Sequence, residues 1–260
     1  MAVMAKAPRP GHVKTRLRTI VSPEEAAALG AAFLMDATTN LHVAATQAPI
    51  HPFVAYAPAG QEARFDGHIA PGTQLVLADG TMGDAPGVDG FGRSLLHAIR
   101  GLLALGYGAA CLVNADGPTL PTTFLVQAAS RLLLPGRRAL LGPAEDGGYW
   151  LIGMQQPEPA LFADIGWSTE HVAAQTTARA AEIGIPLEQA GTWYDVDDPK
   201  SLTRLMQELG QDDRGEDDRA EDDRGEANRG EANRGKAFPA PATVRAVLAM
   251  DLPARLKSGR

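Results

Sequence analysis

The sequence predicts an α/β fold, in which short buried strands alternate with helices. One observation is the nearly continuous apolar run 109–114, because strands buried on both faces of a parallel sheet have this composition. Another is a clear helix start, where Ser22 precedes Pro23 and two acidic residues. With 260 residues, of which 45% are hydrophobic, the chain can bury one substantial core or two small ones.

Further strands and helices follow from local patterns along the chain. Short apolar runs bounded by Gly, Pro or polar residues predict strands, and longer segments with helical spacing of apolar residues predict helices. Strands are expected at 2–5, 51–57, 74–77, 109–114, 139–141 and 149–152, and a last one from 192 to about 197. Helices are expected at 22–45, 93–103, 123–133, 172–183 and 243–250, and from 198 onward.

A change of composition divides the chain into three parts. Residues 1–210 are expected to form the folded domain. Residues 211–236 contain five tandem pentads, DDRGE, DDRAE, DDRGE, ANRGE and ANRGK, with no apolar residue larger than Ala. Such a segment cannot offset the entropy of ordering, so we expect it to be disordered or a frayed charged helix. Residues 237–260 are expected to be a tail whose short helix docks from a distance.

Charge and cysteine content exclude several classes of protein. The net charge is −7, and the pentads carry much of the acidic excess, so nothing suggests a nucleic-acid-binding surface. The single cysteine, Cys111, lies in an apolar run and is expected to be a buried thiol. The first apolar run is too short for a signal peptide, and no run approaches the roughly 18 apolar residues of a membrane helix. A cytoplasmic protein with no membrane partner is therefore expected, and a homodimer is one option for its assembly.

A basic loop follows the first expected strand. Two prolines and a glycine predict a loop over residues 6–17. Backbone N–H groups, Lys and Arg all suit phosphate oxygens, so anion binding is favoured over a merely solvated basic loop. The spacing of a Walker A loop is absent. The candidate phosphate-binding residues are Lys6, Gly11, Lys14, Thr15 and Arg16.

Carboxylates are expected at the carboxyl ends of strands, where open α/β sheets bind ligands. Asp116 follows the run 109–114, and there it can hold Mg²⁺ or Mn²⁺ against a diphosphate, since hard cations prefer oxygen ligands. The alternative is a turn or cap role before Pro118. Asp195 and Asp197 alternate, so both project from one face if their segment is extended, although the segment could simply begin a helix.

An acidic, glycine-rich loop joins the runs 139–141 and 149–152. Glu145 and Asp146 precede Gly147 and Gly148, and glycine permits a positive φ or a close approach to a ligand. Loops held by a sheet frequently carry chemistry, but Asp-Gly is also a good hairpin turn. Both interpretations stay open from the residues alone.

Five blocks of the sequence carry a resemblance to known proteins. The blocks are AKAPRPGHVKTRL (5–17), ADGPTL (115–120), LGPAEDGGYWLIG (141–153), WST (167–169) and DVDDP (195–199). Together they resemble a bacterial family labelled as glycosyltransferases, with the GT-A-like fold of nucleotide-diphospho-sugar transferases, sometimes labelled as involved in arsenosugar biosynthesis. The chain is more distantly similar to 2-phospho-lactate and molybdopterin guanylyltransferases. The resemblance covers about residues 2–208.

The resemblance implies a three-layer α/β transferase domain with a mostly parallel, mixed sheet. It implies a nucleotide or nucleotide-sugar, a small-molecule acceptor, and Mg²⁺ or Mn²⁺ held by Asp116 with Asp195 or Asp197. It also implies catalytic roles for Asp146 and Asp116. The substrate-binding residues would be Glu145, Gly147, Gly148, Tyr149, Trp167 and Ser168, although Ser168 also suits a helix cap and Trp167 a hydrophobic staple.

One block departs from the family pattern. Before its mid-chain helix the family usually has a Gly-Asp-Leu-Gly-Glu-Arg-like run, whereas this chain has DGFGRS at 89–94 and lacks the acid. The role of that loop is therefore left open.

Two reactions suit the implied fold. In a glycosyltransferase, the metal stabilises a leaving nucleoside diphosphate while a carboxylate deprotonates the acceptor. In a nucleotidyltransferase, an acceptor phosphate attacks a nucleoside triphosphate and pyrophosphate leaves. The basic loop favours the second reaction and the acidic pair the first; glycosyl transfer leads because of the family label. A non-catalytic nucleotide-binding protein is a third hypothesis.

Overall fold

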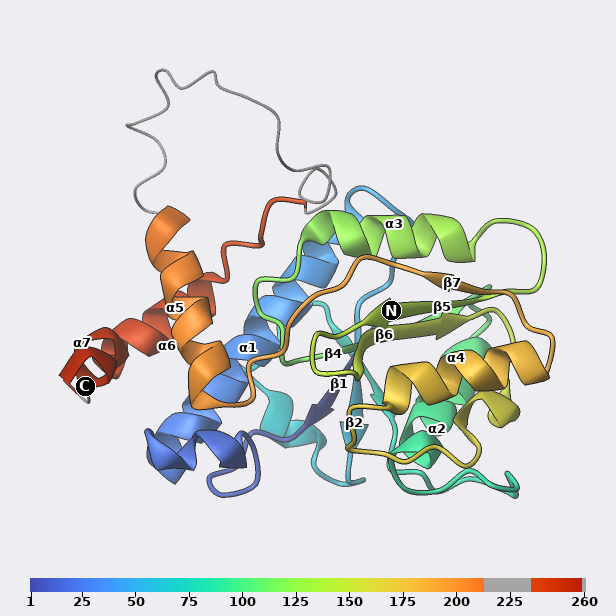
Figure 1. The fold of residues 1–260 in the computed structure, drawn as a ribbon, viewed down its shortest axis with the longest axis horizontal. Helices are drawn as coiled ribbons and strands as arrows, with labels where there is room; N and C mark the ends of the chain where they lie inside the picture. The colour runs from blue at the N-terminus through green and yellow to red at the C-terminus, as the bar shows by residue number, and fades with distance from the viewer. Residues whose placement is uncertain (213–234, 259–260) are drawn as a thin grey trace, which may run out of the picture.

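The α/β fold expected from the sequence is confirmed by a computed structural model, which describes residues 1–212 and 235–258 (Figure 1). Most of the pentad segment, which was expected to be disordered or a frayed charged helix, lies outside these residues. The sheet lies between two layers of helices, as a three-layer domain requires (Figure 1). None of the helices in the described part of the chain is both long and apolar enough to cross a membrane.

Seven strands form one mixed sheet in the order β3-β2-β1-β4-β6-β5-β7. All neighbours pair in parallel except β6, which runs antiparallel to both β4 and β5. The expected mostly parallel, mixed sheet is therefore confirmed. The strands are β1 (Ala2–Lys6), β2 (Phe53–Ala57), β3 (Gln74–Leu77), β4 (Ala110–Asn114), β5 (Ala139–Pro143), β6 (Tyr149–Met154) and β7 (Leu187–Gln189).

Helices cover both faces of this sheet. In Figure 1, α1 and α3 lie on one face, α2 and α4 lie on the other, and α5, α6 and α7 gather at the left end. The helices are α1 (Pro23–Ala45), α2 (Gly90–Ala104), α3 (Thr122–Leu132), α4 (Val172–Glu182), α5 (Pro199–Asp212), α6 (Pro241–Ala249) and α7 (Leu252–Ser258). Three 3-10 helices are η1 (Thr15–Thr19), η2 (Glu62–Phe65) and η3 (Pro159–Phe162).

The predicted start of α1 is confirmed by its hydrogen bonds. The N–H of Glu25 donates to Ser22 Oγ at 3.1 Å, and the N–H of Ser22 donates to Glu25 Oε2 at 2.7 Å. This reciprocal capping box satisfies two of the backbone donors that a helix start leaves without partners.

Each face of the sheet has its own hydrophobic core. Alternation along β1 shows the division, since Val3 packs with Phe33 of α1 in one core and Ala2 packs with Leu96 of α2 in the other. Successive side chains of a strand point to opposite faces, so a strand in a central position is apolar on both sides. This explains the continuous apolar run that predicted β4.

The last expected strand is placed wrongly by the sequence pattern. Residues 192–197 form no strand; Trp193 makes only an isolated bridge with Ala144, and the seventh strand is β7, earlier in the chain. The reason lies in the backbone of Val196, whose N–H donates to Asp116 O at 2.8 Å and whose carbonyl accepts from Lys14 Nζ at 2.7 Å. These groups hold loops together at the sheet edge and are not available for a strand ladder.

Helix α6, in the carboxyl-terminal segment, docks on the rest of the fold. α6 packs against α1, and the buried carboxylate of Asp36 in α1 accepts hydrogen bonds from the N–H groups of Ala242 and Thr243 at 2.9 and 2.7 Å. Burial raises the pKa of Asp36, although these hydrogen bonds oppose the shift. Helix α6 thus receives its amino-terminal cap from a residue some 200 positions earlier.

Candidate functional site

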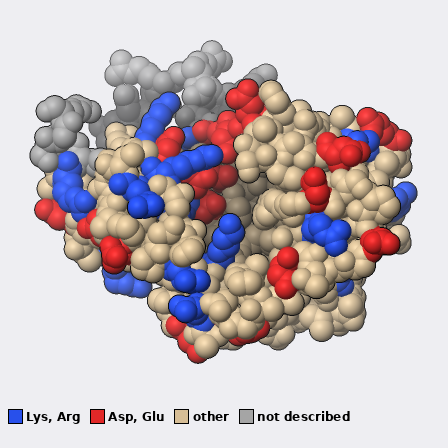
Figure 2. All heavy atoms as spheres, turned by 90° about the horizontal axis from the view of Figure 1, so that it is seen from below, with Lys and Arg blue, Asp and Glu red and all other residues tan. Residues whose placement is uncertain are grey.

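A cavity of about 350 Å³ opens at the carboxyl ends of β1, β2, β3 and β4. β1 lies between β2 and β4, so this is the point where the direction of the strand order reverses, and open α/β sheets bind ligands there. Figure 2 shows the corresponding edge of the molecule, which is hollowed and has both basic and acidic side chains around the hollow. Small side chains, including Ala55, Ala57 and Ala78, leave room along one wall.

The basic loop after β1 forms one side of the cavity. Lys6, His12 and Lys14 line it, whereas Arg9 and Arg16 are exposed outside the set of lining residues. Among the described residues, Lys6, Arg9 and Arg16 make no ion pair, so their charges are available to an anion. Of the other candidates in the loop, Gly11 has a φ of 79° and Thr15 begins η1; both are exposed.

Lys14 joins three segments that are far apart in the sequence. Its Nζ lies 2.5 Å from Asp116 Oδ1 and 3.0 Å from Asp197 Oδ1, and it donates to the carbonyl of Val196. Burial disfavours the charged form of Lys14, but the carboxylates of Asp116 and Asp197 outweigh it and raise the pKa of Lys14. The structure therefore brings one predicted phosphate ligand and two predicted metal ligands into direct contact.

Asp195 lies beside this group in a different setting. Asn114 Nδ2, at the end of β4, donates to Asp195 Oδ1 at 2.7 Å. Burial raises the pKa of Asp195 to about 7, and the negative charge of Asp116 adds to the shift, with smaller contributions from Asp146 and Asp197. Asp116, Asp146 and Asp197 therefore all lie close enough to Asp195 to act on it.

The acidic, glycine-rich loop is the turn of the β5–β6 hairpin, as the Asp-Gly dipeptide suggested. The N–H of Gly148 donates to Asp146 Oδ1 at 2.9 Å, and Asp146 is exposed. Gly147 has a φ of 88°, and a Cβ at this position would lie 2.0 Å from Glu170 O. The loop therefore requires glycine for its close contact with the segment before α4, and the hydrogen bond from Ala173 N–H to Gly147 O ties it to α4 itself.

Glu145 is bound on the other side of the hairpin. Arg204 of α5 donates from Nη1 to Oε2 at 2.5 Å and from Nη2 to Oε1 at 3.1 Å, and its guanidinium stacks 3.9 Å over the ring of Tyr194. Neither Glu145 nor Asp146 is among the residues that line the cavity. Glu145 was predicted to bind substrate, but both of its carboxylate oxygens already accept hydrogen bonds from Arg204.

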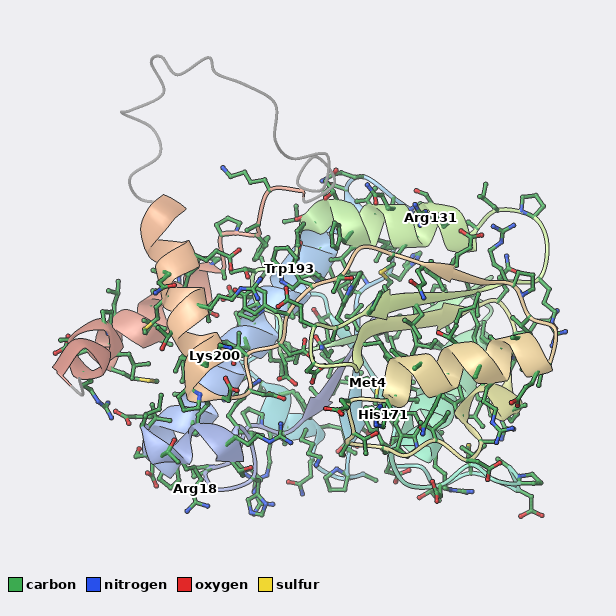
Figure 3. The ribbon with its side chains drawn as sticks, viewed as in Figure 1. Met4, Arg18, Arg131, His171, Trp193 and Lys200 are labelled. Atoms are coloured by element: carbon green, nitrogen blue, oxygen red, sulfur yellow. The ribbon has the colours of Figure 1, made fainter. Side chains whose placement is uncertain are left out.

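Three further substrate-binding candidates are Tyr149, Trp167 and Ser168. The hydroxyl of Tyr149 is buried, and burial raises its pKa. Trp167 packs against Gly92 and meets the half-exposed ring of Phe91, a cavity residue, edge-on at 5.6 Å. The helix-cap interpretation of Ser168 is wrong, because His171 occupies the cap position of α4, where Figure 3 labels it.

Asp116 and Asp197 offer the geometry that best fits a divalent cation. Within the described ranges, no group of three or more His, Cys, Asp and Glu side chains is arranged to hold a metal ion. However, Asp116, Asp197 and the carbonyl of Val196 place three oxygens within 3.0 Å of one point, the Nζ of Lys14. Mg²⁺ commonly takes one or two protein carboxylates and completes its shell with water and substrate phosphate, so this oxygen-only set fits.

Sequence reasoning missed two residues of this region. Asn114 was seen only as the end of a strand, yet its place at the carboxyl edge of β4 was a usable signal. Arg204 gave no signal, because its pairing with Glu145 spans 59 positions and depends on the docking of α5.

Comparisons with known proteins agree with this architecture. A family model described as "Uncharacterized protein conserved in bacteria (DUF2064)" matches residues 40–169, half of the chain. Among curated protein sequences, no significant match was found.

One solved structure with a high TM-score shares the fold. A protein from Desulfovibrio desulfuricans G20, described as a "putative nucleotide-diphospho-sugar transferase", is 24% identical, with a TM-score of 0.71 over 95% of this chain and 94% of that one. This likeness confirms the predicted type of fold. Two structures with lower TM-scores are CMP:2-keto-3-deoxy-manno-octonic acid synthetase complexed with CTP (10% identity, TM-score 0.49, 81% of this chain and 98% of that one) and Rv0371c of Mycobacterium tuberculosis H37Rv complexed with manganese (17%, 0.40, 80% and 100%).

Proposed function

We propose that this chain, which belongs to the bacterial protein family DUF2064, is a metal-dependent transferase that acts on a nucleotide bound in the cavity at the ends of β1 and β4. One observation carries the proposal: the same cavity is lined by two lysines and two aspartates, namely Lys6, Lys14, Asp116 and Asp197. Cations bind phosphate oxygens, and carboxylates hold a divalent cation against the same phosphates. A site that offers both groups at a strand-order switch point suits nucleotide chemistry.

Nucleotidyl transfer is the reaction that the geometry favours. Lys6, Arg9 and Arg16 form no ion pair within the described chain, which suits the charge of a triphosphate better than that of a sugar diphosphate. The acidic pair Glu145 and Asp146 favoured a sugar substrate, but the carboxylate of Glu145 is already bound by Arg204. In this reaction an oxygen of a phosphorylated acceptor attacks the α-phosphate, and pyrophosphate leaves.

Glycosyl transfer is the second candidate, supported by Asp146. This carboxylate is exposed, and its charge reaches Asp195, which neighbours the cavity residue Asn114. A carboxylate in that position is suited to accept the proton of an acceptor hydroxyl. Transfer of a sugar from a nucleotide-sugar to a small acceptor would use it in this way.

The chain's own residues divide the work of either reaction. Asp116 and Asp197 would hold Mg²⁺ or Mn²⁺, which stabilises the charge on the leaving phosphate group when bound. Lys6 and Lys14 would bind phosphate oxygens and orient them. Asn114, which lines the cavity, would hold Asp195 in place with a hydrogen bond of 2.7 Å.

A thermal-shift screen of nucleoside triphosphates and nucleotide-sugars, each with Mg²⁺ or Mn²⁺, tests the proposal. A ligand raises the unfolding midpoint according to its concentration relative to Kd. We expect a triphosphate with metal to give the largest shift, followed by pyrophosphate release when phosphorylated acceptors are added. Shifts with nucleotide-sugars alone would favour glycosyl transfer, and a shift without turnover on any acceptor would favour a binding protein. The absence of any shift would contradict the nucleotide site.

A further inference from the structure

Lys14 differs from the other cations of the basic loop. Its side chain is only 5% exposed, whereas those of Lys6, Arg9 and Arg16 are on the surface. Its backbone has a φ of 47°, in the left-handed region, which costs energy for a residue with a Cβ. Such a conformation persists where surrounding contacts fix it; here the backbone carbonyl of Lys14 accepts from Leu17 N–H at 3.0 Å, and oxygens hold the ammonium group.

The ammonium group of Lys14 has a complete set of oxygen partners. An ammonium carries three N–H donors, and three acceptors lie within reach: Asp116 Oδ1 at 2.5 Å, Val196 O at 2.7 Å and Asp197 Oδ1 at 3.0 Å. The ring of Phe33 lies 5.0 Å from the same nitrogen. These are the same oxygens that fit a divalent cation.

We propose that Lys14 is an exchangeable counter-ion of the metal site, so that a divalent cation must displace its ammonium group from Asp116 and Asp197. The inference rests on the proposed function, which requires a metal ion and a nucleotide in this cavity. A divalent cation on these oxygens would lie close to the buried ammonium, where repulsion between the two cations is strong and weakly screened, so the two compete for the carboxylates. A hard divalent cation prefers the same carboxylate oxygens.

The exchange would couple metal binding to nucleotide binding. Lys14 lines the cavity, so the displaced ammonium can move to the phosphates of a nucleotide. Metal alone must break an ion pair with no replacement partner for Lys14, whereas metal with nucleotide supplies one. Each ligand should therefore strengthen the binding of the other, as linkage requires.

Binding of Mn²⁺ to the full-length protein, without nucleotide, tests the proposal. The signal of free Mn²⁺ in electron paramagnetic resonance gives Kd for the wild type and for Lys14→Met. Lys6→Met is the first control: it removes another positive charge from the same cavity, but the ion pairs of Asp116 and Asp197 are made by Lys14 and not by Lys6. Arg18→Met is the second control and removes an exposed charge from η1; Figure 3 labels Arg18 at the lower edge of the molecule.

We expect Lys14→Met to bind Mn²⁺ at least about tenfold more tightly than the wild type, and both control variants to stay within about threefold. Circular dichroism and a melting curve establish that each variant is folded. If Lys14→Met does not fold, Lys14→Gln provides the same removal of charge with two hydrogen-bond donors retained.

The outcomes separate this inference from the proposed function. Equal Mn²⁺ affinity in wild type and Lys14 variants would overturn the exchange and leave the metal site intact. Weaker binding in the Lys14 variants would also overturn it. Failure of every variant to bind Mn²⁺ would overturn both the exchange and the metal-dependent function.

Discussion

The Asp116–Asp197 pair and the Glu145–Asp146 loop each carry two carboxylates at the same edge of the sheet, but the negative charges of the two pairs are compensated differently. The first pair shares one buried ammonium, that of Lys14, and lines the cavity. In the second, Arg204 binds Glu145 and a backbone N–H binds Asp146, and both carboxylates are exposed. The Asp116–Asp197 pair, whose side chains are 38% and 41% exposed, is compensated by a cation that other ligands can replace, whereas the hairpin loop is held by neighbouring elements of the fold.

This difference indicates that the two regions contribute different properties. A carboxylate pair around a lysine ammonium is suited to exchange cations, because the ammonium stands on a flexible four-carbon stem. A carboxylate beside two glycines in a fixed turn is suited to keep one position relative to a substrate. Mutations in the two regions should therefore separate metal affinity, turnover and stability.

The largest effect is expected from Asp116→Asn. The change removes one of the two carboxylates that would hold the metal and the shorter of Lys14's two carboxylate contacts. Turnover should fall by roughly 10³-fold or more, with Mn²⁺ affinity reduced as well, since a metal that stabilises transferred phosphate is worth several kcal/mol. Product formation and Mn²⁺ titration measure the two effects. Asp66→Asn, at an exposed position, is the control, and full activity of Asp116→Asn would remove this residue from the site.

Asp146→Asn should separate turnover from metal binding. The residue contacts neither Lys14 nor the metal-binding oxygens in the described interactions, so Mn²⁺ affinity should change less than about twofold. Turnover should fall on the order of 10²-fold if the carboxylate accepts a proton. Initial rates at saturating nucleotide test this. A rate equal to that of the wild type would exclude Asp146 as the base.

Gly147→Ala tests whether the hairpin loop is fixed by α4. A Cβ would meet Glu170 O at 2.0 Å, and the φ of 88° is itself unfavourable for alanine. We expect a loss of about 1–3 kcal/mol in the free energy of unfolding, measured by urea denaturation. Gly106→Ala is a matched control, since Gly106 has a φ of 91° and nothing within 4 Å of the new Cβ. Equal losses in both variants would mean that the contact with Glu170 gives way freely.

The smallest effect is expected from Glu145→Gln. The ion pair with Arg204 is bidentate, but both side chains are 43% exposed. Exposed pairs contribute about 0–1 kcal/mol, so the unfolding midpoint in urea should shift only slightly. A loss above about 2 kcal/mol would show that this pair anchors α5 to the hairpin.

Local patterns were sufficient to predict most of the fold. The strand at 109–114 and the helix start at Ser22 depend on nearby residues, and both are found where expected. β7 was missed because its three residues give too short a pattern, and the stronger-looking strand at 192–197 uses its backbone to join loops. Predictions fail here because tertiary hydrogen bonds override local preference.

The members of the candidate site could be predicted individually, but their pairing could not. Lys14 and Asp197 were each singled out, yet their contact joins positions 183 residues apart. Strand order decides which loops meet, and single residues do not encode it. The resemblance implied a catalytic role for Asp146 and a substrate contact for Glu145, yet neither acidic residue of the hairpin lines the cavity.

The cap that Asp36 provides for α6 has a consequence for where the folding unit ends. Val247 and Leu252 belong to the same core as Phe33 of α1, so the last helices are part of the interior and not an appendage. A chain that stopped after α5 would leave the buried carboxylate of Asp36 without its two N–H partners and part of α1 uncovered. The boundary that composition suggests near residue 210 would then divide a single cooperative unit, and we expect both pieces to melt with the sheet in one transition.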